Sequence, residues 1–329
     1  MKSLILAAGK GTRLYPATKK TSKPLMPIAG KETLSFIVDE ILDNNVTEIG
    51  IVVSNENKEE ISLFVEKNYP NFKISLITQE KQLGVAHAVK ISKNFINNDD
   101  FLLYLGDNLF EDGISNLVEA FIKSKKNIIA IKSVDNPKKF GVASLNKQGE
   151  LTDIIEKPSN PPTSFAVAGI YGFKNNIYDH IEKISVSKRG EYEITDAIKS
   201  LIDNGEIIKT QIINGWWIDT GNIDDFLKAN EFKLNINNNF KLPEDSSISG
   251  SNIGPNCLIS NLSQIINSQI TDYTSIGKKV NIANSIITNS IILDNSTIKN
   301  YKLKNCILSK GTSLINTSPN MKIIENKII

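Results

Sequence analysis

Two glycines and two cations lie together in the stretch LILAAGKGTRLYP, which contains a short apolar run near the N-terminus. Gly9 and Gly11 leave backbone N–H groups open to an approaching anion. Lys10 and Arg13 add positive charge, so the loop suits a phosphate chain. The dinucleotide fingerprint G-x-G-x-x-G fails because Leu14 stands in place of its third glycine, and no P-loop spacing occurs. Taken alone, the loop could also be a strand-to-helix turn without a ligand.

Other charged residues could complete a phosphate site with this loop. Lys23 follows ten residues after Arg13, in SKPLMP, and can join it on the same rim. Asp107 ends the apolar run FLLYLGD, and Asp219 lies in GWWIDTG. Mg²⁺ prefers oxygen ligands and takes one or two carboxylates together with substrate phosphates. Each aspartate alone could also be a turn or cap residue, and the two cations could be a solvated surface.

The segments IIEKP and SKRGEYEITD hold further charge. Glu156 and Lys157 are adjacent, and alternation along a strand would send their side chains to opposite faces. A surface ion pair is the alternative for these two residues. The second segment adds Arg189, Glu191 and Asp196. Only the fold can bring these separate segments together.

Alternating strands and helices over residues 1–235 must position these groups. Short apolar runs bounded by turn signals predict strands buried on both faces, and helical patterns lie between them. The alternation predicts a doubly wound α/β domain with a mostly parallel sheet. Ligands of such sheets bind beyond the carboxyl ends of the strands, where both AAGKGTR and GDN are expected. The predicted strands are 3–7, 48–53, 74–78, 101–105 and 128–134, and the predicted helices include 33–44 and 58–68.

A repeat replaces this alternation after a predicted linker over residues 236–244. Over residues 245–329, isoleucine recurs at steps of five or six, and small residues often follow it. A hexapeptide period is typical of a β-helix, in which each coil stacks its isoleucine on the next. Asparagine-rich corners fit this interpretation, because Asn tolerates turn conformations, and a β-sandwich is the alternative. The isoleucines are at 248, 253, 259, 265, 270, 276, 282, 287, 292 and 298.

The composition limits the expected partners and location. The chain has 329 residues, with 38 Lys and Arg against 36 Asp and Glu, so no bulk charge calls for nucleic acid or an anionic membrane. No run approaches the ~18 apolar residues of a membrane span, and the N-terminus lacks a signal-peptide pattern. Cys257 and Cys306 form no metal spacing and no disulfide framework, so we expect two reduced core thiols. These features favour a cytoplasmic protein that binds neither nucleic acid nor membrane.

Five motifs occur in one order: LILAAGKGTRLYPATKKTSKPLMPIAGK, LGDN, EKP, RGEYEITD and WIDTG. Together they resemble the signature of sugar-1-phosphate nucleotidylyltransferases, and among these the glucose-1-phosphate thymidylyltransferases. The resemblance covers about 230 residues and implies a Rossmann-like nucleotidyltransferase domain over residues 1–235. The repeat tail resembles the left-handed β-helix of the family's long forms. The implied substrates are dTTP or UTP and a sugar 1-phosphate, above all glucose 1-phosphate, with Mg²⁺ as cofactor.

The resemblance also implies a role for each matching residue. The glycine loop would wrap the nucleotide phosphates, with Arg13 and Lys23 as the catalytic cations. Gln79 and Gly84, in TQEKQLGVAHA, would contact the base. The remaining matches are Ala8, Gly9, Gly11 and Thr12 for the nucleotide, Asn108, Gly141, Glu156, Lys157, Val167 and Arg189 for the sugar phosphate, and Asp107 and Asp219 for the metal.

Two residues depart from the family's pattern. His87 stands where short bacterial enzymes often carry Gln, and it could read the base or pack within a helix. Phe140 stands where they carry Tyr, which removes a hydroxyl near the sugar. These departures leave the preference for base and sugar open, so galactose and amino-sugar phosphates are possible substrates. They do not affect the reaction type. His180 is expected to have no role.

The implied reaction joins a sugar 1-phosphate to a nucleoside triphosphate and releases pyrophosphate. Because the attacking phosphate oxygen is already anionic, no general base is required, and the reaction depends on positioning and charge neutralisation. Related β-helices can be acetyltransferases, which here would make a bifunctional enzyme for amino-sugar phosphates. Residues 236–329 contain no histidine base, so we expect the tail to assemble a homo-oligomer instead. A non-catalytic sugar-nucleotide-binding subunit is a further alternative, but it would usually lose the charged residues kept at 13, 23, 107 and 219.

Overall fold

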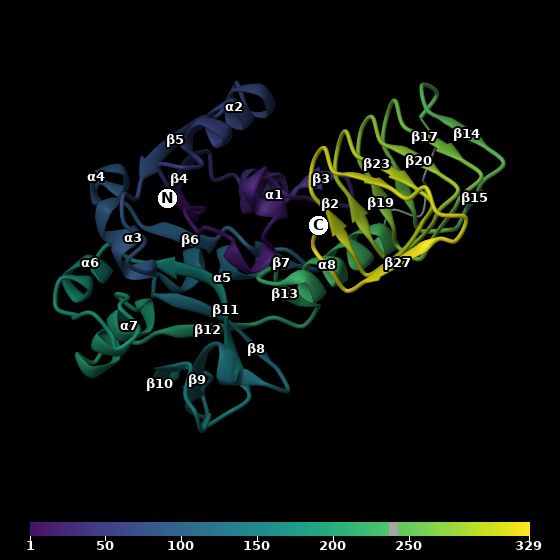
Figure 1. Ribbon diagram of the computed structural model, residues 1–329. Helices are drawn as coiled ribbons and strands as arrows, with labels where there is room; N and C mark the ends of the chain where they lie inside the picture. Colours follow the sequence, from purple (N-terminus) through teal and green to yellow (C-terminus); the bar gives the residue numbers. More distant parts are fainter. Residues whose placement is uncertain (237–242) are drawn as a thin grey trace. The chain divides into compact units, whose positions relative to one another are not determined.

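The computed structural model describes residues 1–236 and 243–329, which divide into two compact units (Figure 1). Unit 1 comprises Met1–Gly9 and Ile37–Trp217, and unit 2 comprises Lys10–Phe36 and Ile218–Ile329. The linker predicted over 236–244 falls mostly outside the described residues. The predicted phosphate loop begins in unit 1 and continues in unit 2.

Unit 1 is built on one mixed sheet, half of which is parallel. The strands of this half are β1 (Lys2–Leu6), β4 (Glu48–Val53), β5 (Lys73–Thr78) and β6 (Phe101–Leu105). Strand β1 pairs in parallel with β4 on one side and β6 on the other, and β5 extends the sheet beyond β4. The predicted strands 48–53 and 101–105 have the same ends in the structure. The Rossmann-like, doubly wound arrangement is therefore confirmed.

The other half of the sheet is largely antiparallel. Its strands are β8 (Ile128–Ser133), β9 (Gly141–Leu145), β10 (Leu151–Glu156), β11 (Phe165–Phe173) and β12 (Lys209–Ile212). Strand β11 runs antiparallel to β6, β8 and β9, while β12 pairs in parallel with β8. Strand β10 folds back on β9 as a hairpin. Because a short connection joins antiparallel neighbours, this hairpin departs from the strand–helix alternation that predicts parallel strands.

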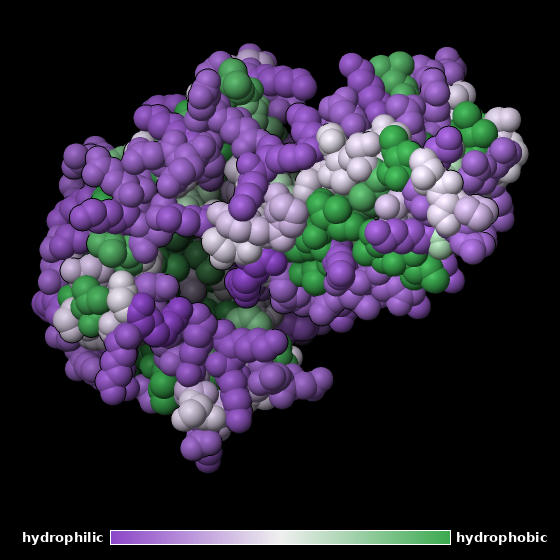
Figure 2. Space-filling model, viewed as in Figure 1, coloured by the Kyte–Doolittle hydropathy of each residue, from purple (hydrophilic) through white to green (hydrophobic). Residues whose placement is uncertain are grey.

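Helices connect many of these strands. They are α1 (Thr33–Asp43), α2 (Lys58–Asn68), α3 (Val85–Ile91), α4 (Lys93–Ile96), α5 (Ser115–Ser124), α6 (Ile177–Ile181) and α7 (Ile194–Asp203). Short elements complete the unit: β7 (Asn108–Phe110), the 3₁₀ turn η4 (Pro137–Lys139) and the start of β13 (Trp217–Asp219). No helix among the described residues is long and apolar enough to cross a membrane. Hydrophilic side chains cover most of the face of unit 1 that Figure 2 shows.

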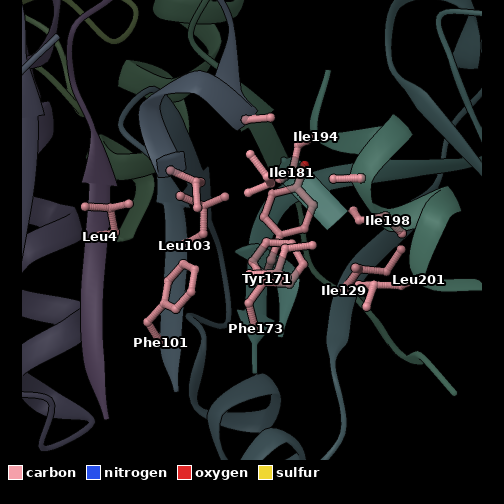
Figure 3. Packing of buried hydrophobic residues seen from close by; sticks show 14 of the residues in the cluster. Leu4, Phe101, Leu103, Ile129, Tyr171, Phe173, Ile181, Ile194, Ile198 and Leu201 are labelled. Carbon is pink, nitrogen blue, oxygen red and sulfur yellow. The ribbon is translucent and has the colours of Figure 1, made fainter. Parts of the chain in front are cut away.

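The core of unit 1 packs the sheet against α6 and α7 (Figure 3). Ile194, Ile198 and Leu201 lie at i, i+4 and i+7 on one face of α7, and all three are buried. From the sheet, the rings of Tyr171 and Phe173 stack with centroids 5.3 Å apart. Burying one large apolar side chain contributes about 1.5–3 kcal/mol. This core fixes the strands whose ends carry the predicted site residues.

Unit 2 contains a β-helix, as the repeat predicts, and its stacked parallel strands fit the left-handed form that the resemblance implies. Three parallel sheets run along it in the described part of the chain. The first sheet contains β14 (Ser247–Ser249), β17 (Gln264–Ile266), β20 (Asn281–Ala283), β23 (Thr297–Lys299) and β26 (Ser313–Ile315). The second contains β15 (Asn252–Ile253), β18 (Gln269–Thr271), β21 (Ile286–Thr288), β24 (Tyr301–Lys304) and β27 (Lys322–Glu325). The third contains β16 (Leu258–Ile259), β19 (Ser275–Ile276), β22 (Ile291–Ile292) and β25 (Ile307–Leu308).

The isoleucines of the repeat stack in register inside the β-helix. In the first sheet Ile265 pairs with Ile282, which pairs with Ile298, and all three belong to one buried cluster. Asn267 and Asn284 occupy corners with left-handed φ angles of 47° and 48°, which Asn tolerates better than most residues. Both cysteines are buried and free, as predicted.

The remainder of unit 2 precedes the β-helix in sequence. Its elements are the 3₁₀ turns η1 (Thr12–Leu14), η2 (Ala17–Lys19) and η3 (Lys23–Leu25), the hairpin of β2 (Pro27–Ile28) and β3 (Lys31–Glu32), and helix α8 (Ile223–Ile236). Helix α8 packs against β2. The segment that carries the predicted catalytic cations is therefore part of the same compact unit as the β-helix.

Candidate active site

The first predicted nucleotide residues lie at the carboxyl end of β1. Ala8 is buried, whereas Gly9 is exposed, and a Cβ added to Gly9 would meet no atom within 4 Å. Asn57 Nδ2 donates a hydrogen bond of 2.8 Å to the carbonyl oxygen of Ala7, which fixes the start of the loop. The backbone at Gly9 thus has the open approach that a phosphate-binding loop requires.

Gln79, Gly84 and His87 form one hydrogen-bonded group at the end of β5. The Gln79 side chain is 4% exposed, and its Nε2 donates to the Gly84 carbonyl at 3.3 Å and lies 3.0 Å from His87 Nδ1. Because a carbonyl only accepts, Nε2 must face Gly84, and His87 Nδ1 then accepts its second N–H. Burial, with the nearby Lys90, lowers the pKa of His87, which favours the neutral ring that can accept. The imidazole also stacks on Tyr192, with ring centroids 6.3 Å apart.

Gly84 joins this group to the RGEYEITD motif. Its φ is +100°, and a Cβ there would lie 2.7 Å from the carbonyl oxygen of Tyr192. The same carbonyl accepts a hydrogen bond of 3.1 Å from the backbone N–H of Ala86, in the first turn of α3. Glycine is therefore required at this position by both conformation and space.

Asp107 and Asn108 follow β6. The Asn108 side chain is 2% exposed, and its Nδ2 donates to Asp107 Oδ1 at 2.8 Å. Its Oδ1 accepts a hydrogen bond of 2.6 Å from Trp217 Nε1. Gly169, with φ +67°, allows this packing, because a Cβ there would lie 2.6 Å from Asn108 Oδ1. These contacts orient the Asp107 carboxylate at the end of its strand.

Glu156, Lys157 and Arg189 form a charged cluster. Strand β10 ends at Glu156, and Lys157 adopts φ +41°, so the alternation of the strand does not continue to Lys157. The expectation of opposite faces is therefore wrong: Glu156 Oε1 lies 3.4 Å from Lys157 Nζ and 3.0 Å from Arg189 Nη1. Thr195 Oγ1 donates to Glu156 Oε2 at 3.2 Å. A left-handed non-glycine residue costs on the order of 1–3 kcal/mol and is common at functional sites.

Arg189 contacts three carboxylates. Besides Glu156, its guanidinium lies 3.3 Å from Glu193 and 3.5 Å from Glu191. Ser187 Oγ donates to Glu193 Oε1 at 2.8 Å. Burial raises the pKa of Glu193, and the negative charge of Glu156 adds to this rise. The cluster thus holds more negative than positive charge around one guanidinium.

Gly141 and Val167 bring β9 and β11 to the same cluster. A Cβ on Gly141 would lie 2.9 Å from Thr195 Cγ2 and 3.4 Å from both Glu156 Oε2 and Val167 Cγ2. Glycine at this position leaves space beside the carboxylate that any side chain would fill. The predicted sugar-phosphate residues at 141, 156, 157, 167 and 189 therefore come together in unit 1.

Phe140 and Trp217 link this cluster to Asn108. Their rings pack with centroids 4.9 Å apart. The Phe140 carbonyl accepts a hydrogen bond of 3.0 Å from the backbone N–H of Lys157. Trp217 in turn donates to Asn108, so an aromatic pair with one polar N–H connects the two groups.

Within unit 2, the rest of the loop brings two predicted catalytic cations close to glycines. Gly11 has φ +62°, and a Cβ there would lie 2.9 Å from Lys23 Cβ. Thr18 Oγ1 donates to the Gly11 carbonyl at 2.8 Å. Arg13 is exposed, and its guanidinium packs on Gly221, where a Cβ would lie 2.8 Å from Nη2. Glycines thus let the chain pass close to both Lys23 and Arg13.

The two predicted metal ligands belong to different units, Asp107 to unit 1 and Asp219 to unit 2. Across residues 1–236 and 243–329, no group of three or more His, Cys, Asp or Glu side chains is arranged to hold a metal ion. Each aspartate by itself offers the carboxylate oxygens that Mg²⁺ prefers, and this ion takes only one or two carboxylates beside phosphate oxygens and water.

Four contributors to these groups were not singled out by the sequence analysis: Tyr192, Glu193, Thr195 and Gly221. All four lie inside the quoted motifs RGEYEITD and WIDTG. Their positions within motifs were the available signal, because a hydroxyl, a ring or a glycine carries little chemical information alone. His180, expected to have no role, is buried and hydrogen-bonds Ser200 at 2.8 Å.

The fold and these groups define a class: a Rossmann-like α/β protein with glycine-flanked cations, carboxylates at strand ends and a β-helix tail. The chain belongs to the nucleotidyl transferase family, whose model matches residues 2–236. Within that family it is a sugar-1-phosphate nucleotidyltransferase, on the similarities that follow.

The glucose-1-phosphate thymidylyltransferase of Streptomyces griseus is 32% identical over 319 residues, which cover 95% of this chain and 88% of that protein. The bifunctional protein GlmU of Methanococcus maripaludis is 44% identical over 237 residues, 71% of this chain, but this chain spans only 55% of its length. Among solved structures, a glucose-1-phosphate thymidylyltransferase from Bacillus anthracis in complex with sucrose matches with a TM-score of 0.66. That match has 33% identity and covers 74% of this chain and 98% of the other.

Proposed function

We propose that this chain transfers a nucleotidyl group from dTTP or UTP to a sugar 1-phosphate, with glucose 1-phosphate as the first candidate, and releases pyrophosphate. The cluster of Glu156, Lys157 and Arg189 carries the proposal, because one carboxylate lies within 3.4 Å of two cations. A phosphorylated sugar needs both kinds of group together: carboxylates accept hydrogen bonds from hydroxyls, and cations bind phosphate. The similarity to a thymidylyltransferase over most of the chain supports these substrates.

In this proposal the nucleotide and the sugar phosphate use different groups. Gln79 and Gly84 contact the base, and Arg13 and Lys23 neutralise the triphosphate. The backbone of residues 8, 9, 11 and 12 wraps the phosphates. The sugar phosphate contacts Asn108, Gly141, Glu156, Lys157, Val167 and Arg189.

Arg189 must exchange partners when the sugar phosphate binds. Its three carboxylate contacts span 3.0–3.5 Å and lie at a partly exposed guanidinium, which solvent and an incoming anion can reach. A phosphate accepts paired hydrogen bonds from a guanidinium and carries more charge than one carboxylate. The carboxylates would then be released towards the sugar hydroxyls.

The proposed chemistry is a direct displacement at phosphorus. An oxygen of the sugar phosphate forms a bond to the α-phosphorus, and the bond from that phosphorus to the bridging oxygen breaks, with its electron pair leaving on pyrophosphate. Because the attacking oxygen is already anionic, no side chain needs to remove a proton. The chain's residues then serve to align two polyanions and to offset their repulsion.

Asp107 and Asp219 are the residues that would hold Mg²⁺. When bound, the ion would neutralise phosphate oxygens and orient the leaving group. Arg13, Lys23 and Lys157 supply the remaining positive charge in this proposal.

The β-helix is proposed to assemble a homo-oligomer in the cytoplasm. Apolar side chains gather on the β-helix face that Figure 2 shows. Three isoleucines on its outer surface, Ile266, Ile315 and Ile323, are 44%, 57% and 62% exposed. A contiguous apolar patch on a protein surface is typical of a subunit contact. Acetyl transfer by the tail is not proposed, because residues 236–329 contain no histidine.

The test is a matrix of nucleoside triphosphates against sugar 1-phosphates, followed by pyrophosphate release. We expect dTTP or UTP with glucose 1-phosphate to give the highest kcat/KM. Lys157→Gln should raise the KM for the sugar phosphate on the order of tenfold or more, since it removes a charged phosphate contact. Lys199→Gln is the matched control, because Lys199 forms an ion pair of 2.7 Å with Asp153 outside the cluster. Equal effects of the two variants would contradict the proposal.

A further inference from the structure

We infer that the β-helix is a positioning scaffold for residues 10–36, which it holds through the side chain of Asn230 on α8. This role differs from assembly of subunits, and it rests on the proposed function because residues 10–36 carry Arg13 and Lys23. All contacts that support it lie within unit 2.

Asn230 connects three separate segments of chain. Its side chain is fully buried. Its Oδ1 accepts hydrogen bonds from the backbone N–H of Ala29 at 2.9 Å and from Ser275 Oγ at 2.7 Å. Its Nδ2 donates to the carbonyl of Tyr273 at 2.7 Å. One amide thus ties the turn between β2 and β3 to a coil of the β-helix, and a buried amide with its hydrogen bonds satisfied holds its geometry firmly.

The same turn packs directly on the β-helix. Ala29 and Gly30 form its tip, both with left-handed φ angles, 49° and 76°. A Cβ on Gly30 would lie 2.6 Å from Leu258 Cδ2, on β16. Directly after η2, Lys20 Nζ also donates to the carbonyl of Lys310 at 3.0 Å. The segment is therefore attached to the tail at more than one point.

The outward side chains of the third sheet of the β-helix are buried. In β19, β22 and β25 the residue before each inward one points outward, yet Ser275, Ile291 and Ile307 are all at most 4% exposed. In the first sheet, by contrast, the outward residue Ile266 is 44% exposed. The outer face of a coil is buried only when another segment packs on it. Asn230 contacts this face through Ser275.

Of the proposed catalytic cations, Arg13 contacts a residue near α8, and Lys23 lies near the anchored turn in sequence. Gly221, two residues before α8 begins, packs against the guanidinium of Arg13. Gly11 packs against Lys23, which precedes the anchored turn by six residues. Helix α8 begins two residues after the glycine on which Arg13 packs, and its middle is hydrogen-bonded to the β-helix, so it transmits the position of the tail to the loop.

The test compares Asn230→Leu with the wild-type full chain in two measurements. Hydrogen–deuterium exchange should become faster in the peptide around Ala29, because its amide loses its acceptor. In steady-state kinetics, kcat/KM for the triphosphate should fall on the order of 10–100-fold, as for a misplaced catalytic group. The KM for the sugar phosphate should stay the same, because the residues proposed to bind it lie in unit 1.

Two further variants separate positioning from general stability. Ser290→Ala removes a buried hydrogen bond of 3.0 Å to Cys306 inside the coil, so it should lower the melting temperature without changing either kinetic constant. Asn230→Asp keeps Oδ1 as acceptor for Ala29, and because burial favours the protonated carboxyl, its other oxygen can still donate to the Tyr273 carbonyl. It should therefore restore part of the lost kcat/KM, and it remains informative if Asn230→Leu does not fold.

An unchanged kcat/KM for the triphosphate despite faster exchange around Ala29 would overturn the inference. So would an equal kinetic loss in Ser290→Ala. A wild-type chain that releases no pyrophosphate with any substrate would contradict the proposed function alone, because the exchange comparison would still decide whether Asn230 anchors the turn.

Discussion

Polar side chains have different roles in the α/β sheet and in the β-helix. In the sheet they lie at strand ends and contact one another, as Glu156 does with Lys157 and Arg189. In the β-helix, buried serines bond to the backbone: Ser263 Oγ donates to the Gly277 carbonyl at 2.8 Å and accepts from the Val280 N–H at 3.1 Å. Bonds to backbone complete the fold, whereas charged groups at strand ends can exchange their partners for a substrate.

This contrast predicts that changes at the two places have opposite signatures. Substitution at the strand ends and the glycine loop should reduce turnover with little loss of stability. Substitution of a buried serine in a coil should reduce stability with no loss of turnover. Asn230 is the exception, since its buried side chain bonds to backbone and yet holds the loop.

The largest effect should follow removal of divalent cations. Treatment with EDTA should abolish pyrophosphate release, because two polyanions then meet without the metal charge. Added Mg²⁺ should restore the rate, and the melting temperature should change little. Full activity after chelation would contradict the role proposed for Asp107 and Asp219.

Arg13→Ala should lower kcat on the order of 10³-fold, by analogy with other arginines that stabilise phosphoryl transfer. Because Arg13 is exposed, the melting temperature should stay close to the wild-type value. The matched control is Lys19→Ala, since Lys19 is an exposed cation of the same segment that lies over the ring of Tyr15. Comparable turnover in Arg13→Ala and the control would refute the proposed role of the loop.

His87→Phe should raise the KM for the triphosphate about fivefold, with kcat nearly unchanged. Phenylalanine keeps a ring on Tyr192 but removes the acceptor that holds the Gln79 amide, and one such hydrogen bond is worth about 1 kcal/mol. His87→Gln should recover most of the affinity, because its amide oxygen can accept. If both variants bind the triphosphate equally well, the ring nitrogen does not position Gln79.

The smallest effect on turnover should come from Ser290→Ala. Its Oγ donates to the Thr288 carbonyl at 2.8 Å and accepts from the backbone N–H of Cys306. Leaving that buried N–H without its acceptor should cost about 1–3 kcal/mol of unfolding free energy. Denaturant unfolding measures this loss. A parallel drop in kcat would contradict the statement that buried serines of the coil affect stability alone.

Local periodicity made much of the fold predictable. The apolar runs at 48–53 and 101–105 gave strands with the right ends, and the isoleucine steps gave the inward positions of the β-helix. Both patterns depend on neighbours in sequence. The antiparallel pairing of β11 with three strands depends on distant residues, and no local pattern marks it.

The site was predictable where a motif carried it and not where the backbone departed from a regular element. Strand alternation placed Lys157 on the wrong face, because its left-handed φ is a property of the folded turn. The attachment of residues 10–36 to the tail was not foreseen either. Asn230 lies in a helix with no motif around it, and its three partners are 43–201 residues away in sequence.

Sugar-phosphate-dependent nucleotidyl transfer is the central claim, and ³¹P NMR of the wild-type protein tests it directly. With dTTP or UTP, glucose 1-phosphate and Mg²⁺, the account predicts that triphosphate and sugar phosphate disappear together. A nucleoside diphosphate sugar and pyrophosphate should form in equal amounts. Triphosphate breakdown that proceeds at the same rate without any sugar phosphate, or no reaction with any sugar 1-phosphate, would contradict the claim.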